Sequence, residues 1–165
     1  MQTLVRVEGF ETAFQDLYPR AIRSVQRLLG DRTQAEDIAS EALARAFADW
    51  QSIEHLPHRD AWVLRVAMNL ALDSLRRRVP FLRPPAPIDA SEVATLRVAL
   101  WAALRSLPKR QREIIVLRFI AGLGDEEVAE SLSISPQTVK KHRARGLSTL
   151  RKSLSIDDEE ALREL

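Results

Sequence analysis

Residues 60–78 are the most constraining stretch of the chain, because apolar side chains cover most of the circumference that a helix here would have. The apolar members are Val63, Leu64, Val66, Ala67, Met68, Leu70, Ala71, Leu72 and Leu75. A helix that is apolar on nearly every side needs neighbours on nearly every side, so it should lie at the centre of a bundle. No stretch alternates apolar and polar residues as a half-buried strand does, so the sequence predicts an all-α fold.

Two stretches before this one also repeat apolar residues at helical spacing. The first covers residues 10–29 and ends at Gly30, while the second begins near Thr33 and continues to Trp50. Glu36 follows Thr33 by three positions, which predicts a capping box at the start of the second helix.

A proline-rich run then divides the chain. Residues 79–87 contain four prolines in nine residues, which cannot continue a helix. Helical patterns resume at Ser91 and again at Pro108, so we expect two small helical domains. The expected organisation is a first domain at 10–78, a linker at 79–90, a second domain at 91–153 and an acidic tail at 154–165.

The second domain ends in a pattern typical of a helix-turn-helix. Residues 122–124 break the preceding helix, and Asp125 is expected to cap the next one. Residues 133–135 form a short turn, and Ser135 should cap a second helix. Pro136 stands at the first position of that helix, where a missing N–H costs nothing.

The second helix of this motif is basic on one face. Residues 136–153 contain six Lys or Arg and no acid, although the net charge of the whole chain is only +2. Val139, Leu147 and Leu150 give the same helix an apolar side. A helix in the major groove of DNA needs one side fixed to a scaffold and another that offers donors to phosphates and base edges. The alternative is a solvated basic face on an ordinary surface helix, but the complete lack of acids favours DNA binding.

Arg143 breaks this pattern, because it falls on the apolar face, four residues from Val139. Its side chain could extend to the edge of that face. Alternatively, it could pair with Glu126, Glu127 or Glu130 of the preceding helix, and the sequence leaves both alternatives open.

A narrow polar line at Arg65, Asn69 and Asp73 interrupts the apolar surface of the helix at 60–78. The same helix ends in three consecutive arginines. In an isolated helix, such a line would be a solvent-facing side whose terminal cations complement the helix dipole.

Four segments of the chain match one family in order. They are residues 31–47 (DRTQAEDIASEALARAF), 61–78 (AWVLRVAMNLALDSLRRR), 104–118 (LRSLPKRQREIIVLR) and the helix-turn-helix at 125–152. Together they resemble the extracytoplasmic-function sigma factors of the sigma-70 family of bacterial RNA polymerase, the first two segments in region 2 and the last two in region 4. The resemblance implies an alternative sigma factor that binds core RNA polymerase and directs transcription initiation at promoters by recognising −35 and −10 elements.

The resemblance implies three binding surfaces. The residues implied at the −35 element are Thr138, Lys140, Lys141, His142, Ala144, Arg145 and Ser148. Those implied at the −10 element are Arg65, Asn69, Asp73, Arg76 and Arg77. Those implied at the clamp of core polymerase are Asp37, Ser40, Glu41 and Arg45.

Two of these side chains have chemistry that suits a base contact. The Asn69 amide would pair with the edge of an unstacked base, and the planar fork of Arg145 would meet O6 and N7 of a guanine. Trp62 also matches the family, but its position favours core packing over base stacking. Arg143 and Ser40 depart from the residues usual in the family. Lys141 and His142 also depart from them, so the −35 sequence preferred here need not match that of a relative.

The implied partners are promoter DNA and core RNA polymerase, through its clamp and flap regions, with an anti-sigma factor as a further partner common in the family. The main alternative is a response-regulator-type helix-turn-helix activator, because residues 138–142 (TVKKH) also resemble the output domain of those proteins. Such a protein would carry a receiver domain of alternating strands and helices, and the first half of this chain has no strand pattern.

The chain has no cysteine, which excludes disulfides, thiolate metal sites and thiol catalysis. His55 and His58 could suggest a metal pair, but no third and fourth ligand follows at suitable spacing. We therefore expect no enzymatic activity, no cofactor and no metal. No run approaches the roughly 20 apolar residues of a membrane span, so we expect a soluble, cytoplasmic protein.

Overall fold

The computed structural model describes residues 2–78 and 92–154, with side chains described for 9–77 and 96–154. Every element in these ranges is helical, which confirms the predicted all-α fold. The helices are α1 (Gln2–Leu29), α2 (Arg32–Ala48), α3 (Trp50–Ile53), α4 (Arg59–Arg78), α5 (Glu92–Ser106), α6 (Lys109–Ile115), η2 (Val116–Ile120), α7 (Asp125–Ser131) and α8 (Pro136–Leu154). The predicted linker at 79–90 and the acidic tail, apart from Leu154, lie outside the described residues.

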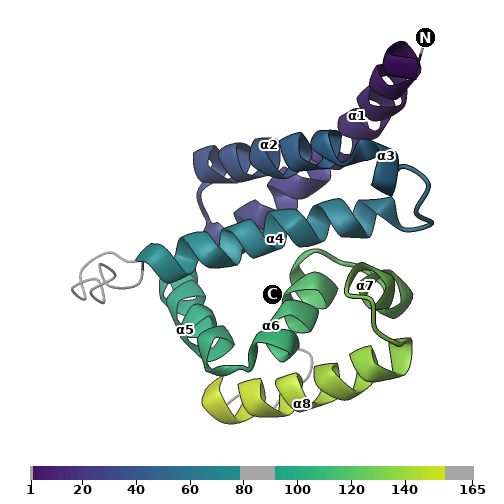
Figure 1. The fold of residues 1–165 in the computed structure, drawn as a ribbon. Coiled ribbons are helices and arrows are strands. Elements are labelled where there is room, and N and C mark those ends of the chain that lie inside the picture. Colours follow the sequence, from purple (N-terminus) through teal and green to yellow (C-terminus); the bar gives the residue numbers. More distant parts are fainter. Residues whose placement is uncertain (1, 79–91, 155–165) are drawn as a thin grey trace.

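α4 lies at the centre of the molecule, as its apolar circumference predicted. α1 and α2 cover one side of it, while α7 and η2 contact the other. Figure 1 shows α6 and α7 between α4 and α8, so that α8 forms the outer edge opposite α2. Leu64, Ala67, Met68 and Ala71 are almost completely buried.

One hydrophobic core runs through both halves of the chain. The same cluster contains Leu64 and Met68 of α4, Leu117 of η2 and Val128 of α7. A second, smaller cluster surrounds Trp50, where the N-terminal half of α1 meets the C-terminal end of α2. The C-terminal helices therefore pack directly against the N-terminal bundle in this structure.

The start of α2 differs from the prediction. Asp31, with extended backbone, is the N-cap, and its carboxylate accepts a hydrogen bond from the backbone N–H of Gln34 at 3.0 Å. Thr33 is already inside the helix, and Glu36 pairs with Arg32 at 2.9 Å instead of completing a capping box. The predicted box was wrong because Asp31, two residues earlier, supplies a stronger acceptor at the same helix end.

Other helix ends agree with the sequence in part: α1 begins at Gln2 instead of residue 10, and the short helix α3 was not predicted. Gly30 ends α1 with a φ of +74°, a conformation that glycine adopts without strain. The stretch predicted as one helix from Pro108 to about Ala121 is α-helical only to Ile115 and then widens into the π-helical η2. In η2 the backbone N–H of Ala121 donates to the carbonyl of Val116 at 3.0 Å, a five-residue step.

Candidate nucleic-acid interface

Both helices of the helix-turn-helix begin at a defined cap. Gly124 is the N-cap of α7, and its backbone N–H donates to the Glu127 carboxylate at 2.6 Å. Asp125, predicted as this cap, is the first helical residue instead. Ser135 caps α8 as predicted, because its hydroxyl accepts from the backbone N–H of Thr138 at 3.1 Å. In the turn between them, Ser133 has a φ of +53°.

α8 is fixed to the scaffold by a narrow apolar side. Val139 and Leu150 are buried, and Leu147 packs against the same core. Gly146 lies between them against α6, where a Cβ atom would meet the Ile115 side chain at 3.0 Å. This close approach was missed from the sequence, although a glycine inside an otherwise helical pattern is a signal for it.

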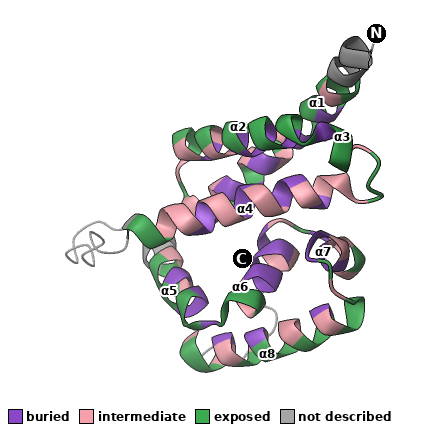
Figure 2. Ribbon diagram, in the orientation of Figure 1, coloured by how far each residue is buried: buried purple, intermediate pink, exposed green. Residues whose placement is uncertain are grey.

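The opposite side of α8 exposes the predicted −35 residues. Lys140, Lys141, Ala144, Arg145 and Ser148 are all exposed and, by helical spacing, share the side of α8 opposite the buried Val139, Gly146 and Leu150. Figure 2 shows exposed and buried segments alternating along α8. Alanine at position 144 keeps the middle of this face low, so that the backbone can approach a groove. The structure therefore presents the cations on one accessible surface, with an apolar anchor behind them, as the major groove requires.

Thr138 and His142 differ from the rest of this set, because both are half-buried. The Thr138 hydroxyl lies 2.8 Å from that of Ser135, in the cap of the helix. Nδ1 of His142 is buried and has no hydrogen-bond partner among the described residues. Both side chains therefore lie at the edge of the exposed face.

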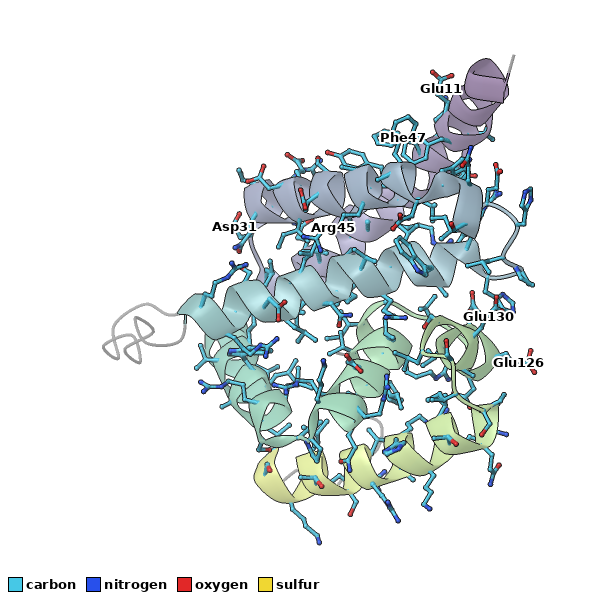
Figure 3. All side chains as sticks on the ribbon, viewed as in Figure 1. Glu11, Asp31, Arg45, Phe47, Glu126 and Glu130 are labelled. Carbon is cyan, nitrogen blue, oxygen red and sulfur yellow. The ribbon has the colours of Figure 1, made fainter. Side chains whose placement is uncertain are left out.

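In the structure, Arg143 forms an ion pair with an acid that was not among the alternatives. Its Nη1 donates to Oδ1 of Asp125 at 2.5 Å, so the side chain pairs with α7 but with none of the three glutamates considered. Of these, Glu127 bonds the cap, Glu130 faces His58 at 3.7 Å, and Glu126 points outward (Figure 3). The pairing with Asp125 explains how an arginine is accommodated on the inner side of α8.

Arg118 of η2 joins the same carboxylate. Its Nε lies 2.9 Å from Oδ1 of Asp125 as an ion pair, and its Nη1 donates to the carbonyl of Leu123. The Asp125 side chain is 18% exposed, so both ion pairs are largely shielded from water. Asp125 therefore links α8 to η2.

The predicted −10 residues on α4 face the C-terminal helices. Arg65 donates a hydrogen bond to the backbone carbonyl of Ser131 at the end of α7. Asn69, Asp73 and Arg76 line a cavity of about 160 Å³ whose other wall is α6. The structure thus places four of the five predicted residues on the side of α4 that faces α6 and α7. Arg65, Asn69 and Asp73 are half-buried there, whereas Arg76 is exposed.

Arg77 is the fifth member of this set and is exposed. Trp62 is half-buried against the second hydrophobic cluster, in line with the expected core packing.

The predicted polymerase-binding residues share an exposed side of α2. Asp37, Ser40, Glu41 and Arg45 are all exposed, and Arg45 pairs with Glu41 at 2.9 Å. The Ser40 hydroxyl donates to the Glu36 carbonyl at 2.8 Å. At the end of this side, the exposed Phe47 ring stands 4.9 Å from that of Phe10, and Figure 3 shows it among other aromatic side chains. The surface is therefore accessible, with an aromatic group at one end.

Other site types find little support in the part of the chain that the structure describes. There, no group of three or more His, Cys, Asp or Glu side chains is placed to hold a metal ion. His55 is exposed, and His58 faces Glu130. No described helix is long and apolar enough to cross a membrane.

Comparisons with known proteins match both halves of the chain. Residues 13–80 match Sigma-70 region 2, and residues 97–150 match Sigma-70, region 4. The chain is 34% identical over 158 residues to the RNA polymerase sigma-E factor of Streptomyces coelicolor, covering 92% of this chain and 89% of the relative. It is 29% identical over 171 residues to the ECF RNA polymerase sigma factor SigW of Bacillus subtilis, covering 89% of this chain and 91% of the relative.

Solved structures share the fold. CnrH in complex with the cytosolic domain of CnrY has a TM-score of 0.65 at 19% identity, covering 94% of this chain and 97% of CnrH. The sigma factor RpoE in complex with the anti-sigma factor NepR, from Bartonella quintana, has a TM-score of 0.59 at 22% identity, covering 90% of this chain and 98% of RpoE. With both regions matched in order and a relative above 30% identity along nearly the whole chain, this protein belongs to the extracytoplasmic-function group of the sigma-70 family.

Proposed function

We propose that this protein is an alternative sigma factor that binds core RNA polymerase and directs it to promoters with particular −35 and −10 elements. The observation that carries the proposal is the exposed cationic face of α8, held by an apolar anchor within a chain that matches sigma-70 regions 2 and 4. Its role is binding and positioning in the cytoplasm, with no catalytic step of its own.

Each part of the chain takes one task in this proposal. Residues 10–78 form the part that binds polymerase and the −10 element, and residues 91–153 form the part that reads the −35 element. The linker at 79–90 sets the reach between them. The response-regulator alternative is not favoured, because the described N-terminal residues form helices without the strands of a receiver domain.

At the −35 element, α8 would enter the major groove with its exposed face. Lys140 and Lys141 would neutralise phosphates, which supplies affinity without sequence preference. Arg145 would make the bidentate contact to a guanine, which supplies discrimination. Thr138 and His142 would contact the DNA from the edge of this face.

At the −10 element, the proposal requires the C-terminal helices to move. Asn69 would hold an unstacked base, and Arg65, Arg76 and Arg77 would hold phosphates of the single strand. In the described structure α6 and α7 lie opposite this side of α4 and leave Asn69 half-buried, and Arg65 is bonded to Ser131. We infer that polymerase binding separates the two halves and so exposes the −10 surface at the promoter.

The exposed side of α2 would dock on the clamp of core polymerase through Asp37, Ser40, Glu41 and Arg45, and the C-terminal half would reach the flap. An anti-sigma factor is a further proposed partner. Two structures that share this fold, CnrH and RpoE, were solved with CnrY and with the anti-sigma factor NepR.

Reconstitution with core RNA polymerase tests the proposal. The full chain, mixed with core enzyme of its own host, should start specific run-off transcripts from a subset of genomic fragments. Core enzyme alone is one control and should not start these transcripts. Holoenzyme with the double substitution Lys140→Ala and Arg145→Ala is the other control and should lose them. If the complete holoenzyme starts no transcript beyond those of core enzyme alone, the protein is not a sigma factor.

A further inference from the structure

The cavity between α4 and α6 is lined mainly by charged groups. Its walls are formed by Asn69, Leu72, Asp73, Arg76, Lys109, Arg112 and Glu113, and its volume is about 160 Å³. A single water needs only about 10–15 Å³ of such space. The cavity therefore has room for a small ion together with some of its waters.

The two acids in this wall are already paired. Asp73 accepts from Arg76 on the next turn of α4, and Glu113 lies 3.2 Å from Nη1 of Arg110. Among the described residues, neither Lys109 nor Arg112 has an ion pair within 4.0 Å. The cavity thus contains two cations that form no ion pair with a neighbouring carboxylate of the described residues.

Arg112 is the least exposed of the three cations that line the cavity, since Arg76 and Lys109 are exposed. Its side chain is half-buried, and burial lowers the pKa of its guanidinium. The nearby charges of Arg76 and Arg105 lower that pKa further, while Glu113 raises it. A guanidinium stays charged at any physiological pH. The cost of its partly buried charge is therefore offset by a bound anion and not by the loss of a proton.

We propose that this cavity is a binding site for a phosphate-type oxyanion. Arg112 provides a planar fork that suits two oxygens of a phosphate, and Lys109 adds a second charge from the first turn of α6. Arg76 and the Asn69 amide complete the site from α4. The donors come from both walls, so a bound anion would bridge them.

The bridge would also affect the state of the molecule. An anion held by α4 and α6 together favours the arrangement in which both helices line this cavity. Asn69 and Arg76 are then engaged and cannot meet a −10 strand. This regulatory consequence rests on the proposed function, whereas the anion site itself does not.

Isothermal titration calorimetry on the full chain tests the site with three probes: inorganic phosphate, pyrophosphate and a short single-stranded oligonucleotide. Ionic strength is matched with sodium chloride, because screening alone changes weak charge interactions. Arg112→Gln should weaken binding by about tenfold, as expected for the loss of a charged hydrogen-bond donor. Lys109→Gln should act in the same direction, and Arg112→Lys should restore part of the affinity. Arg23→Gln, which removes the same charge from an exposed position on α1, is the matched control.

The outcomes separate the sources of the phosphate group. Binding of phosphate or pyrophosphate that depends on Arg112 identifies a free anion as the ligand. Arg112-dependent binding of the oligonucleotide alone identifies the backbone phosphate of DNA. The proposal fails if no probe binds, or if Arg112→Gln and Lys109→Gln bind every probe as tightly as the unaltered chain. Run-off transcription by the same variants distinguishes this failure from failure of the sigma-factor proposal.

Discussion

Nη1 of Arg143 in α8 donates to Oδ1 of Asp125, the first residue of α7, at 2.5 Å. Nε of Arg118 lies 2.9 Å from the same oxygen, so one carboxylate serves two arginines from two other helices. These side chains are 18–27% exposed, so their charges are stabilised mainly by each other and less by water. Asp125 thus connects α8 and η2 to the start of α7.

Removing Asp125 should therefore destabilise the protein more than removing either arginine. Asp125→Ala leaves two arginines partly buried without their acceptor and should lower the free energy of unfolding by about 1–3 kcal/mol. Arg143→Leu should cost less, because leucine suits the apolar side of α8 and Arg118 still balances Asp125. Urea unfolding of both variants and of the double variant measures the coupling. Strictly additive effects would show that the pair is not a functional unit.

Gly146 should tolerate only a small side chain. A Cβ atom there meets Cγ1 of Ile115 at 3.0 Å, and Ile115 is buried. In Gly146→Ala, a gain in helix propensity of about 1 kcal/mol offsets the cost of this tight contact. Gly146→Val should lower the free energy of unfolding by about 1–3 kcal/mol through overpacking. Thermal unfolding checks the result, with Ser153→Val on the exposed side of the same helix as the control. Equal melting temperatures for the two valine variants would contradict the close approach.

Arg145 should contribute discrimination at the −35 element, whereas Lys141 should contribute affinity alone. Arg145→Ala should cost about 1–3 kcal/mol, mainly as lost preference at one base pair. Lys141→Ala, on another exposed position of α8, should weaken all sequences alike and reduce the salt dependence. Holoenzyme binding to promoters with single −35 substitutions separates the two patterns. A uniform loss in Arg145→Ala would remove its reading role.

Asn69 should act after the −35 element is bound. Asn69→Ala should leave holoenzyme binding to duplex −35 DNA unchanged and reduce the amount of open complex, because the amide contacts a base only once that base is unstacked. Permanganate reactivity of thymines near the −10 element measures opening, and a filter-binding assay measures the earlier step. Equal losses at both stages would contradict the assigned position.

Arg65 should help to hold the two halves together in the free protein. It bonds the Ser131 carbonyl across the α4–α7 contact. Arg65→Ala should therefore increase the distance between fluorophores placed on α2 and α8. Cysteine labelling for this measurement is simple because the chain has no cysteine of its own. Since Arg65 is also a proposed phosphate contact, Arg77→Ala serves as control: it removes another such contact but has an exposed side chain and should leave the distance unchanged.

The sequence determined the features that depend on neighbours along the chain. The apolar circumference of residues 60–78 predicted a central helix, Gly30 and Ser135 marked helix ends, and the spacing of the lysines placed them together on α8. Helical periodicity alone decides which side chains share a face, so these predictions needed no tertiary information. The prediction of a cap at Thr33 was wrong because Asp31, two residues earlier, is the better hydrogen-bond acceptor.

Only the tertiary structure decided which faces meet. The partner of Arg143 is 18 residues away and that of Arg65 is 66 residues away, and no local pattern relates such positions. In an isolated helix the polar line on α4 would face solvent, yet Arg65, Asn69 and Asp73 are half-buried opposite α6 and α7, because the apolar core continues from one half of the chain into the other. Spacing along a helix determines which side chains share a surface. Packing between distant segments determines what that surface contacts.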